Sequence, residues 1–106
     1  MIPQIQPADL KRMLDAGRPL VLLDVRQPDE HAFCALPDSV LIPLGELAGR
    51  VEEVQSGDAP VVVYCHHGVR SLSGAAILRR AGMEAVSLAG GIDRWTLTVD
   101  PSVPRY

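Results

Sequence analysis

One segment of the 106-residue chain combines the side chains that nucleophilic catalysis and anion binding need. Residues 65–71, Cys-His-His-Gly-Val-Arg-Ser, follow the apolar run 61–64 and precede a stretch that we expect to be helical. Cys65 then lies where a buried strand gives way to a helix, so backbone N–H groups and the positive end of the helix dipole can face its sulfur. Arg70 adds a full positive charge nearby. The segment therefore predicts an activated thiolate in an anion-binding loop.

The other residues of this loop fit the same chemistry. Gly68 permits a backbone with positive φ, which a tight loop of inward N–H groups commonly requires. The Arg70 guanidinium is a planar fork of donors that suits sulfate, thiosulfate or phosphate. The Ser71 hydroxyl can cap the following helix by accepting a backbone N–H. His66 and His67 are expected at the mouth of the pocket, where protonation of either would favour anions.

Several of these side chains also have simpler interpretations. Cys65 could be a buried core cysteine, although a structural thiol needs no flanking glycine and arginine. Arg70 could be an ordinary solvated charge. His66 and His67 could bind zinc with Cys65, but adjacent histidines lack the usual ligand spacing, so no metal is expected. The apolar surroundings of Cys34 favour a packed thiol over a redox role.

The elements that would position the loop alternate between short apolar runs and helical patterns. Apolar runs typical of strands occur at 20–25, 40–42, 61–64 and 85–88. Helical patterns occur at 6–17, 29–33, 44–54, 71–81 and after the glycines at 90–91. This alternation predicts an α/β fold with a central, mainly parallel sheet of about five short strands and helices on both faces. Ligands of such sheets bind beyond the carboxyl ends of the strands, where Cys65 lies.

Length and composition restrict the function further. A chain of 106 residues suits one domain, which we expect to span residues 1–106. The net charge of −3 gives no electrostatic reason to bind nucleic acid. The chain has no apolar run that could span a membrane and no signal-peptide pattern, so a cytoplasmic location is expected. Two cysteines in such a chain give little support for a structural disulfide.

Four motifs, in order along the chain, resemble those of the rhodanese-like sulfurtransferase family. Residues 65–71 are similar to its active loop, Cys-x-x-Gly-x-Arg-Ser. Residues 23–30 resemble its first strand with the Asp-Val-Arg motif, and residues 88–95 resemble its closing signature. The second block, Cys-Ala-Leu-Pro-Asp-Ser at 34–39, departs from the usual Gly-His-Ile-Pro-Gly-Ala. This variant is similar to rhodanese domains fused to adenylyltransferases that activate sulfur-carrier proteins.

The resemblance implies a rhodanese-like fold and a sulfurtransferase of the thiosulfate type, in which Cys65 carries the transferred sulfur as a persulfide. The substrate-binding loop that it implies consists of His66, His67, Gly68, Val69 and Arg70. It also implies supporting roles for Ser71, Asp24 and Arg26, the last two bracing the loop from a neighbouring strand. The implied donor is a thiosulfate-like anion, and the acceptor is cyanide, a thiol or a sulfur-carrier protein. Such covalent catalysis requires no metal or organic cofactor.

Two other functions remain open. Cysteine-dependent phosphatases and arsenate reductases of the same fold have Cys-x5-Arg, whereas four residues separate Cys65 from Arg70. The tighter loop fits a cysteine that carries one extra sulfur and crowds a tetrahedral phosphoryl group. A non-catalytic rhodanese-like binding module would share the overall motifs, but such modules usually lack the cysteine.

Overall fold

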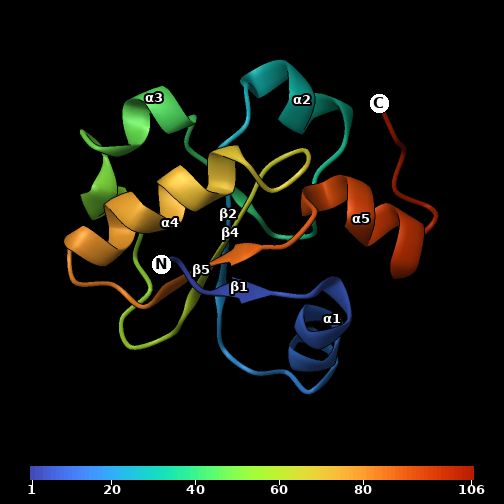
Figure 1. Ribbon diagram of the computed structural model, residues 1–106, viewed down its shortest axis with the longest axis horizontal. Coiled ribbons are helices and arrows are strands. Elements are labelled where there is room, and N and C mark those ends of the chain that lie inside the picture. Colours follow the sequence, from blue (N-terminus) through green and yellow to red (C-terminus); the bar gives the residue numbers. More distant parts are fainter.

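Five short strands form one sheet in the computed structural model, which describes residues 1–106 (Figure 1). Neighbouring strands are all parallel, and their order across the sheet is β1-β5-β4-β2-β3. The strands are β1 (Gln4–Ile5), β2 (Val21–Asp24), β3 (Val40–Leu41), β4 (Val61–Tyr64) and β5 (Ala85–Leu88). The expected sheet of about five short parallel strands is therefore confirmed.

Helices cover both faces of the sheet, as the sequence predicts. They are α1 (Pro7–Asp15), α2 (Pro28–Phe33), α3 (Leu44–Leu47), α4 (Arg70–Arg80) and α5 (Gly91–Thr98), with a 3-10 turn η1 (Val51–Glu53). One face carries α3 and α4, and the other carries α1 and α5, which contact each other. In Figure 1, α2 lies beside the loop that leads into α4. The longest helix, α4, has 11 residues, and no helix has the length and apolar character that crossing a bilayer requires.

The side chains of β4 point alternately to the two faces of the sheet, and this alternation determines on which face Cys65 lies. Val61 and Val63 point into the core under α3 and α4, whereas Val62 and Tyr64 point into the core under α1 and α5. Cys65 continues the first series and belongs to the same core cluster as Val63. Its sulfur is therefore directed toward the beginning of α4.

The two cysteines lie on opposite sides of this sheet. Cys34 is 8% exposed and packs in the α1–α5 core beside Leu36 and Trp95, whereas Cys65 belongs to the α3–α4 core. Both are free thiols. The packed apolar role expected for Cys34 is confirmed, and the intervening sheet keeps the two sulfur atoms apart.

The single helix predicted over residues 44–54 is wrong. The chain instead forms α3, a turn at residues 48–50, and η1. Gly45 and Gly49 lower the helix propensity of this segment, and the N–H of Arg50 donates to the Leu47 carbonyl three residues back. Leu47 and Val54 nevertheless belong to the same core. The apolar spacing therefore predicted these buried side chains correctly, but it did not predict the conformation of the backbone between them.

The sequence reasoning did not identify β1. This strand has only two residues and adds to the sheet edge by pairing Gln4 with Ser87 and Ile5 with Leu88. Two residues are too few to establish a period along the chain, so no local pattern could have marked this strand.

Candidate active site

Cys65 is the first residue after β4 and begins the loop that leads into α4. Its Sγ accepts two main-chain N–H groups, from Gly68 at 3.1 Å and from Ser71 at 3.4 Å. The inward N–H groups expected from the sequence are therefore present, and such donors favour an anionic sulfur. Only 1% of Cys65 is exposed, so an incoming molecule needs the side chains around the loop to move aside.

Glycines at two places allow the tight path of this loop. Gly68 has a φ of 95°, and a Cβ at this position would lie 2.9 Å from the nitrogen of Gly90. Gly91 has a φ of 62°, and a Cβ there would lie 2.5 Å from the carbonyl oxygen of Cys65. Both positions thus combine a left-handed backbone with a close approach to another backbone segment. The positive φ predicted for Gly68 is confirmed.

The first turn of α5 fixes the carbonyl groups of the loop. The N–H of Ile92 donates to the Cys65 carbonyl at 2.9 Å, and the N–H of Asp93 donates to the His66 carbonyl at 3.1 Å. These bonds turn the loop carbonyls toward α5. The N–H groups of the following residues are then free to face the sulfur.

Ser71 does not cap α4, and the expectation that it would is wrong. The helix begins at Arg70, Val69 is the N-cap residue, and no side chain caps this end. Ser71 is instead inside the first turn, with its Oγ 2.7 Å from the Oγ of Ser87 and 3.4 Å from the Cys65 Sγ. Its hydroxyl is therefore a buried polar neighbour of the sulfur.

The Arg70 guanidinium is directed at Glu30 of α2. Its two terminal nitrogens donate to the two carboxylate oxygens of Glu30 at 2.8 and 2.9 Å. The Arg70 side chain is 35% exposed and that of Glu30 is 16% exposed. The hydrogen bonds from Arg70 are the main reason that the pKa of Glu30 falls to about 2. The guanidinium expected to bind a donor anion is thus already occupied by a carboxylate.

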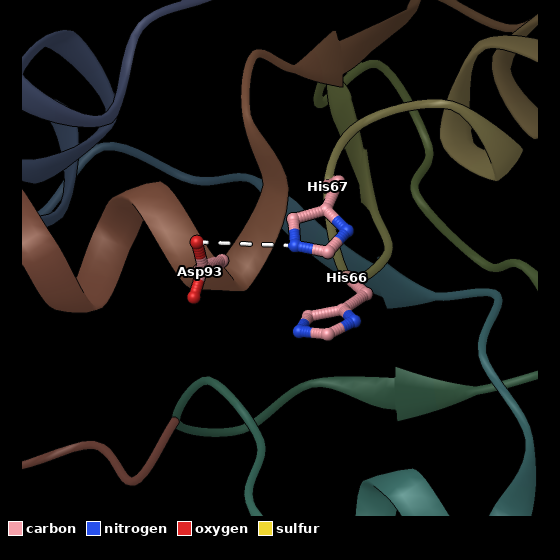
Figure 2. A group of neighbouring side chains, drawn as sticks. All are labelled: His66, His67 and Asp93. Carbon is pink, nitrogen blue, oxygen red and sulfur yellow. Dashed lines mark ion pairs between the residues drawn. The ribbon is translucent and has the colours of Figure 1, made fainter. Parts of the chain in front are cut away.

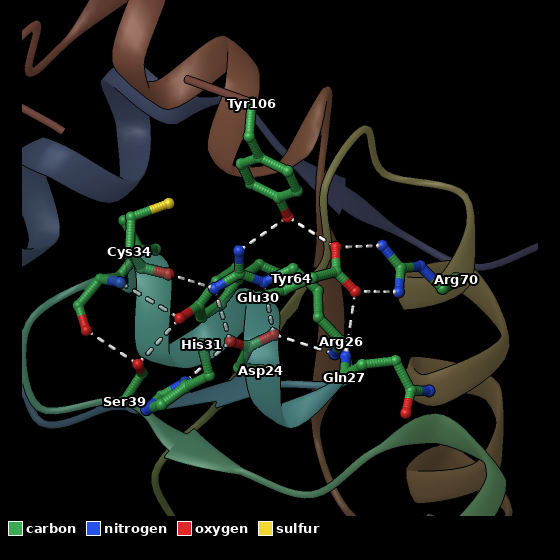
Figure 3. A network of polar contacts seen from close by, with 11 residues as sticks. Asp24, Arg26, Gln27, Glu30, His31, Cys34, Ser39, Tyr64, Arg70 and Tyr106 are labelled. Carbon is green, nitrogen blue, oxygen red and sulfur yellow. Dashed lines mark hydrogen bonds and ion pairs between the residues drawn. The ribbon is translucent and has the colours of Figure 1, made fainter. Parts of the chain in front are cut away.

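Asp24 and Arg26 form a buried ion pair at the end of β2 (Figure 3). Both side chains are fully buried, and the Arg26 Nε and one terminal nitrogen donate to Asp24 at 2.9 and 2.7 Å. The other terminal nitrogen donates to the Tyr106 hydroxyl at 2.7 Å, and this hydroxyl donates to Glu30 at 2.7 Å. The pair therefore reaches Arg70 through Tyr106 and Glu30, and not by direct contact with the loop.

His66 and His67 gather with Asp93 on the outer side of the loop (Figure 2). The two imidazole rings stack with centroids 3.8 Å apart, and His66 also stacks on Tyr106 at 3.9 Å. The ligand atoms of the three residues lie within 4.8 Å of one another, a grouping that could hold a metal ion. The Asp93 carboxylate is, however, already paired with Arg105 at 2.9 Å. Burial and then the neighbouring His67 lower the pKa of His66, which favours its neutral form.

Neither cavity of the molecule opens at this loop. The larger one, of about 600 Å³, is bounded by residues of α1, β2, β3 and η1, among them Leu14, Val21, Val40 and Glu53. The smaller one, of about 410 Å³, lies beside Pro60, before β4. Tyr106 stacks on His66, and the role of His66 and His67 at a pocket mouth stays a prediction. Val69 is 73% exposed, and its place in a substrate-binding loop stays a prediction.

The sequence reasoning missed three residues that surround the site. Glu30 pairs with Arg70 across 40 positions, Tyr106 bonds Arg26 across 80 positions, and Ser87 meets Ser71 across 16 positions. Such partners are defined by the fold, because no spacing rule links residues so far apart. The one local signal is Ser87 itself, a polar residue inside the otherwise apolar strand β5.

Comparison with known proteins places this chain in a family. The model of the rhodanese-like domain matches residues 6–98. The chain is 36% identical to the probable adenylyltransferase/sulfurtransferase MoeZ of Mycobacterium tuberculosis over 104 residues, which cover 96% of this chain and 26% of MoeZ. The chain thus spans about a quarter of the length of that relative.

Solved structures give the same assignment. The thiosulfate sulfurtransferase of Pseudomonas aeruginosa superposes with a TM-score of 0.86 and 29% identity, covering 98% of this chain and 20% of that one. A rhodanese-like domain protein of Staphylococcus aureus superposes with a TM-score of 0.84 and 26% identity, covering 99% of both chains. The chain belongs to the rhodanese-like domain family and is related to sulfurtransferases.

Proposed function

We propose that this chain is a sulfurtransferase that carries a sulfane sulfur as a persulfide on Cys65. The observation that carries the proposal is the geometry at Cys65 Sγ, which faces the N–H groups of Gly68 and Ser71 at the carboxyl end of a central strand. These donors favour negative charge on sulfur, both on the free thiolate and on a persulfide. Membership of the rhodanese-like family supports the same reaction class.

The reaction proceeds in two displacement steps. The Cys65 thiolate attacks the outer sulfur of a donor such as thiosulfate; a new S–S bond forms, the donor S–S bond breaks, and its electron pair leaves with sulfite. A nucleophilic acceptor then attacks the terminal sulfur of the persulfide, and the Cys65 thiolate leaves. Neither step requires a metal or an organic cofactor. We propose that loop residues 66–70 bind the donor and the terminal sulfur, and that Arg70 becomes available to a donor anion only after it leaves Glu30.

The partners follow from this chemistry. We propose that the donor is a small sulfur-containing anion, with thiosulfate as the assay example, and that the acceptor is cyanide in an assay, or a thiol or a sulfur-carrier protein in a cell. The similarity to MoeZ, a probable adenylyltransferase/sulfurtransferase, supports the last of these acceptors. We place the chain in the cytoplasm, because a reducing compartment keeps a free catalytic thiol reduced.

Mass spectrometry of the intact protein after incubation with thiosulfate tests the proposal. We expect the wild-type chain to gain the mass of one sulfur atom and a Cys65 peptide to carry it. Cyanide should remove the added mass and release thiocyanate. Cys65→Ser should show no gain, because the nucleophile is absent.

Cys34→Ser is the matched control, since Cys34 is the other free thiol and lies on the opposite face of the sheet. This variant should still gain the sulfur. An unmodified Cys65 with every sulfane donor tried would favour a non-catalytic binding module. Hydrolysis of p-nitrophenyl phosphate that is abolished by Cys65→Ser would instead favour a phosphatase.

A further inference from the structure

Three arginines near the loop are each paired with a carboxylate. Arg26 pairs with Asp24 at 2.7 Å, Arg70 with Glu30 at 2.8 Å, and Arg105 with Asp93 at 2.9 Å. Each pair carries almost no net charge. The rim of a loop that has to attract a donor anion is therefore largely compensated in charge.

Of these carboxylates, Glu30 is the one that pairs with Arg70, the arginine of the active-site loop. It occupies both terminal nitrogens of the guanidinium, which are the donors that would bind two oxygens of a sulfur oxyanion. Its position is also held from two other sides, because the Tyr106 hydroxyl donates to it at 2.7 Å and the Gln27 N–H donates to it at 3.0 Å. A dianion must displace this carboxylate or bind beside its negative charge.

We infer that Glu30 is a specificity-determining residue, which acts through Arg70 to disfavour dianionic donors such as thiosulfate and to favour alkyl persulfides of lower net negative charge. The inference rests on the proposed function of Cys65 and adds the class of donor. Glu30 is a positioning residue, because it holds Arg70 and does not contact the sulfur. Arg94, beside Gly90, has no carboxylate partner, so some attraction for anions remains and thiosulfate is disfavoured, not excluded.

Both donors load the same sulfur by balanced steps. With an alkyl persulfide, the Cys65 thiolate attacks the terminal sulfur; a new S–S bond forms, the donor S–S bond breaks, and the alkyl thiolate leaves and takes up a proton. With thiosulfate, the leaving group is sulfite. The two donors differ mainly in the negative charge that must come close to Glu30 and Arg70. Their relative rates therefore report on the charge of the loop.

The test compares the loading of Cys65 from thiosulfate and from cysteine persulfide in single-turnover experiments, measured by intact mass. Glu30→Gln should raise kcat/KM for thiosulfate on the order of tenfold, mainly through KM, because a unit charge a few ångströms away is removed. Its rate with cysteine persulfide, which carries about one negative charge fewer, should rise only about threefold, because the interaction energy is proportional to the charge of the donor. Glutamine keeps the N-terminal contact of α2, since Gln also serves at this position of a capping box.

Two controls separate charge from structure. Glu53→Gln breaks a similar surface pair with Arg50, far from the loop in the α3–η1 segment, and should leave both rates unchanged. Glu30→Asp keeps the negative charge and should stay near the wild-type donor ratio. Added salt provides a readout that a folding defect would not produce: thiosulfate loading should depend only weakly on ionic strength in the wild type and fall steeply in Glu30→Gln.

The possible failures are distinguishable. If the wild type loads sulfur but Glu30→Gln leaves the ratio of thiosulfate to persulfide rates unchanged, the role of Glu30 is wrong and the proposed function stands. If thiosulfate loading by the wild type already falls steeply with salt, the loop is not compensated and the inference also fails. If no donor loads the wild type, the proposed function fails and the inference with it.

Discussion

Glu30 accepts hydrogen bonds from Arg70, Tyr106 and the main chain of Gln27, so a single carboxylate joins α2 to the active-site loop. The bonds from Arg70 are the largest reason that its pKa falls to about 2 in the folded chain, from an ordinary value of 4.5. A carboxylate whose pKa is lower when folded stabilises the native state above the unfolded pKa. This stabilisation is lost as the pH falls toward the folded pKa.

The pH dependence of unfolding tests this linkage. Wild type and Glu30→Gln should differ in urea-unfolding free energy near neutral pH, with the wild type more stable. The difference should shrink between about pH 5 and about pH 2, as the carboxylate becomes protonated in both states. Glu52→Gln, which removes an exposed carboxylate without an ion pair, should follow the wild-type curve. Parallel curves for wild type and Glu30→Gln over this range would contradict the linkage.

Individual residues of the site were predictable to different degrees. Cys65, Gly68 and the inward N–H groups follow from a short local pattern, because a strand end, a glycine and a helix start lie within seven residues. The orientation of Arg70 was not predictable, since its partner Glu30 lies 40 positions away. For the same reason Ser71 was assigned to the helix cap: its true neighbour, Ser87, is on another strand.

At the scale of elements, the contact between the loop and the start of α5 shapes the site. Strands at 61–64 and 85–88 and the helix near 71–81 were predictable, because each has a long enough periodic or apolar pattern. The close approach of the active-site loop to the start of α5 was not predictable, although both segments contain glycine. Gly91 shows its physical basis, since a side chain there would overlap the carbonyl groups of the loop.

Gly91→Ala should therefore disturb both folding and the sulfur site. Gly57 is a matched control, because its φ of 58° is close to the 62° of Gly91 but nothing lies within 4 Å of an added Cβ. Gly57→Ala should cost about 1 kcal/mol of unfolding free energy for the left-handed backbone alone. Gly91→Ala should cost about 2–3 kcal/mol more, because backbone atoms must move. Equal costs in urea unfolding would mean that α5 does not constrain the loop.

At the scale of the whole molecule, three separate parts of the chain meet at the site. The end of β2 and the residues just after it contribute the buried pair of Asp24 and Arg26, α2 contributes Glu30, and the C-terminal segment contributes Tyr106. The Tyr106 hydroxyl is the point where they meet, since it accepts from Arg26 and donates to Glu30. Such a contact could not be predicted from the sequence, because it depends on how the sheet, helix and C-terminal segment pack together.

Tyr106→Phe isolates this junction, because phenylalanine keeps the ring that stacks on His66 and loses only the hydroxyl. One terminal nitrogen of the fully buried Arg26 then has no partner, so we expect a loss of about 1–2 kcal/mol in unfolding free energy. Ser102→Ala removes a hydroxyl from the same C-terminal segment that bonds only the nearby Asp100, and should cost less than about 0.5 kcal/mol. Urea unfolding of the two variants measures the difference. If both variants change stability equally, the Tyr106 hydroxyl does not hold the C-terminal segment against the buried ion pair. The segments around Cys65 are then held together by apolar packing alone.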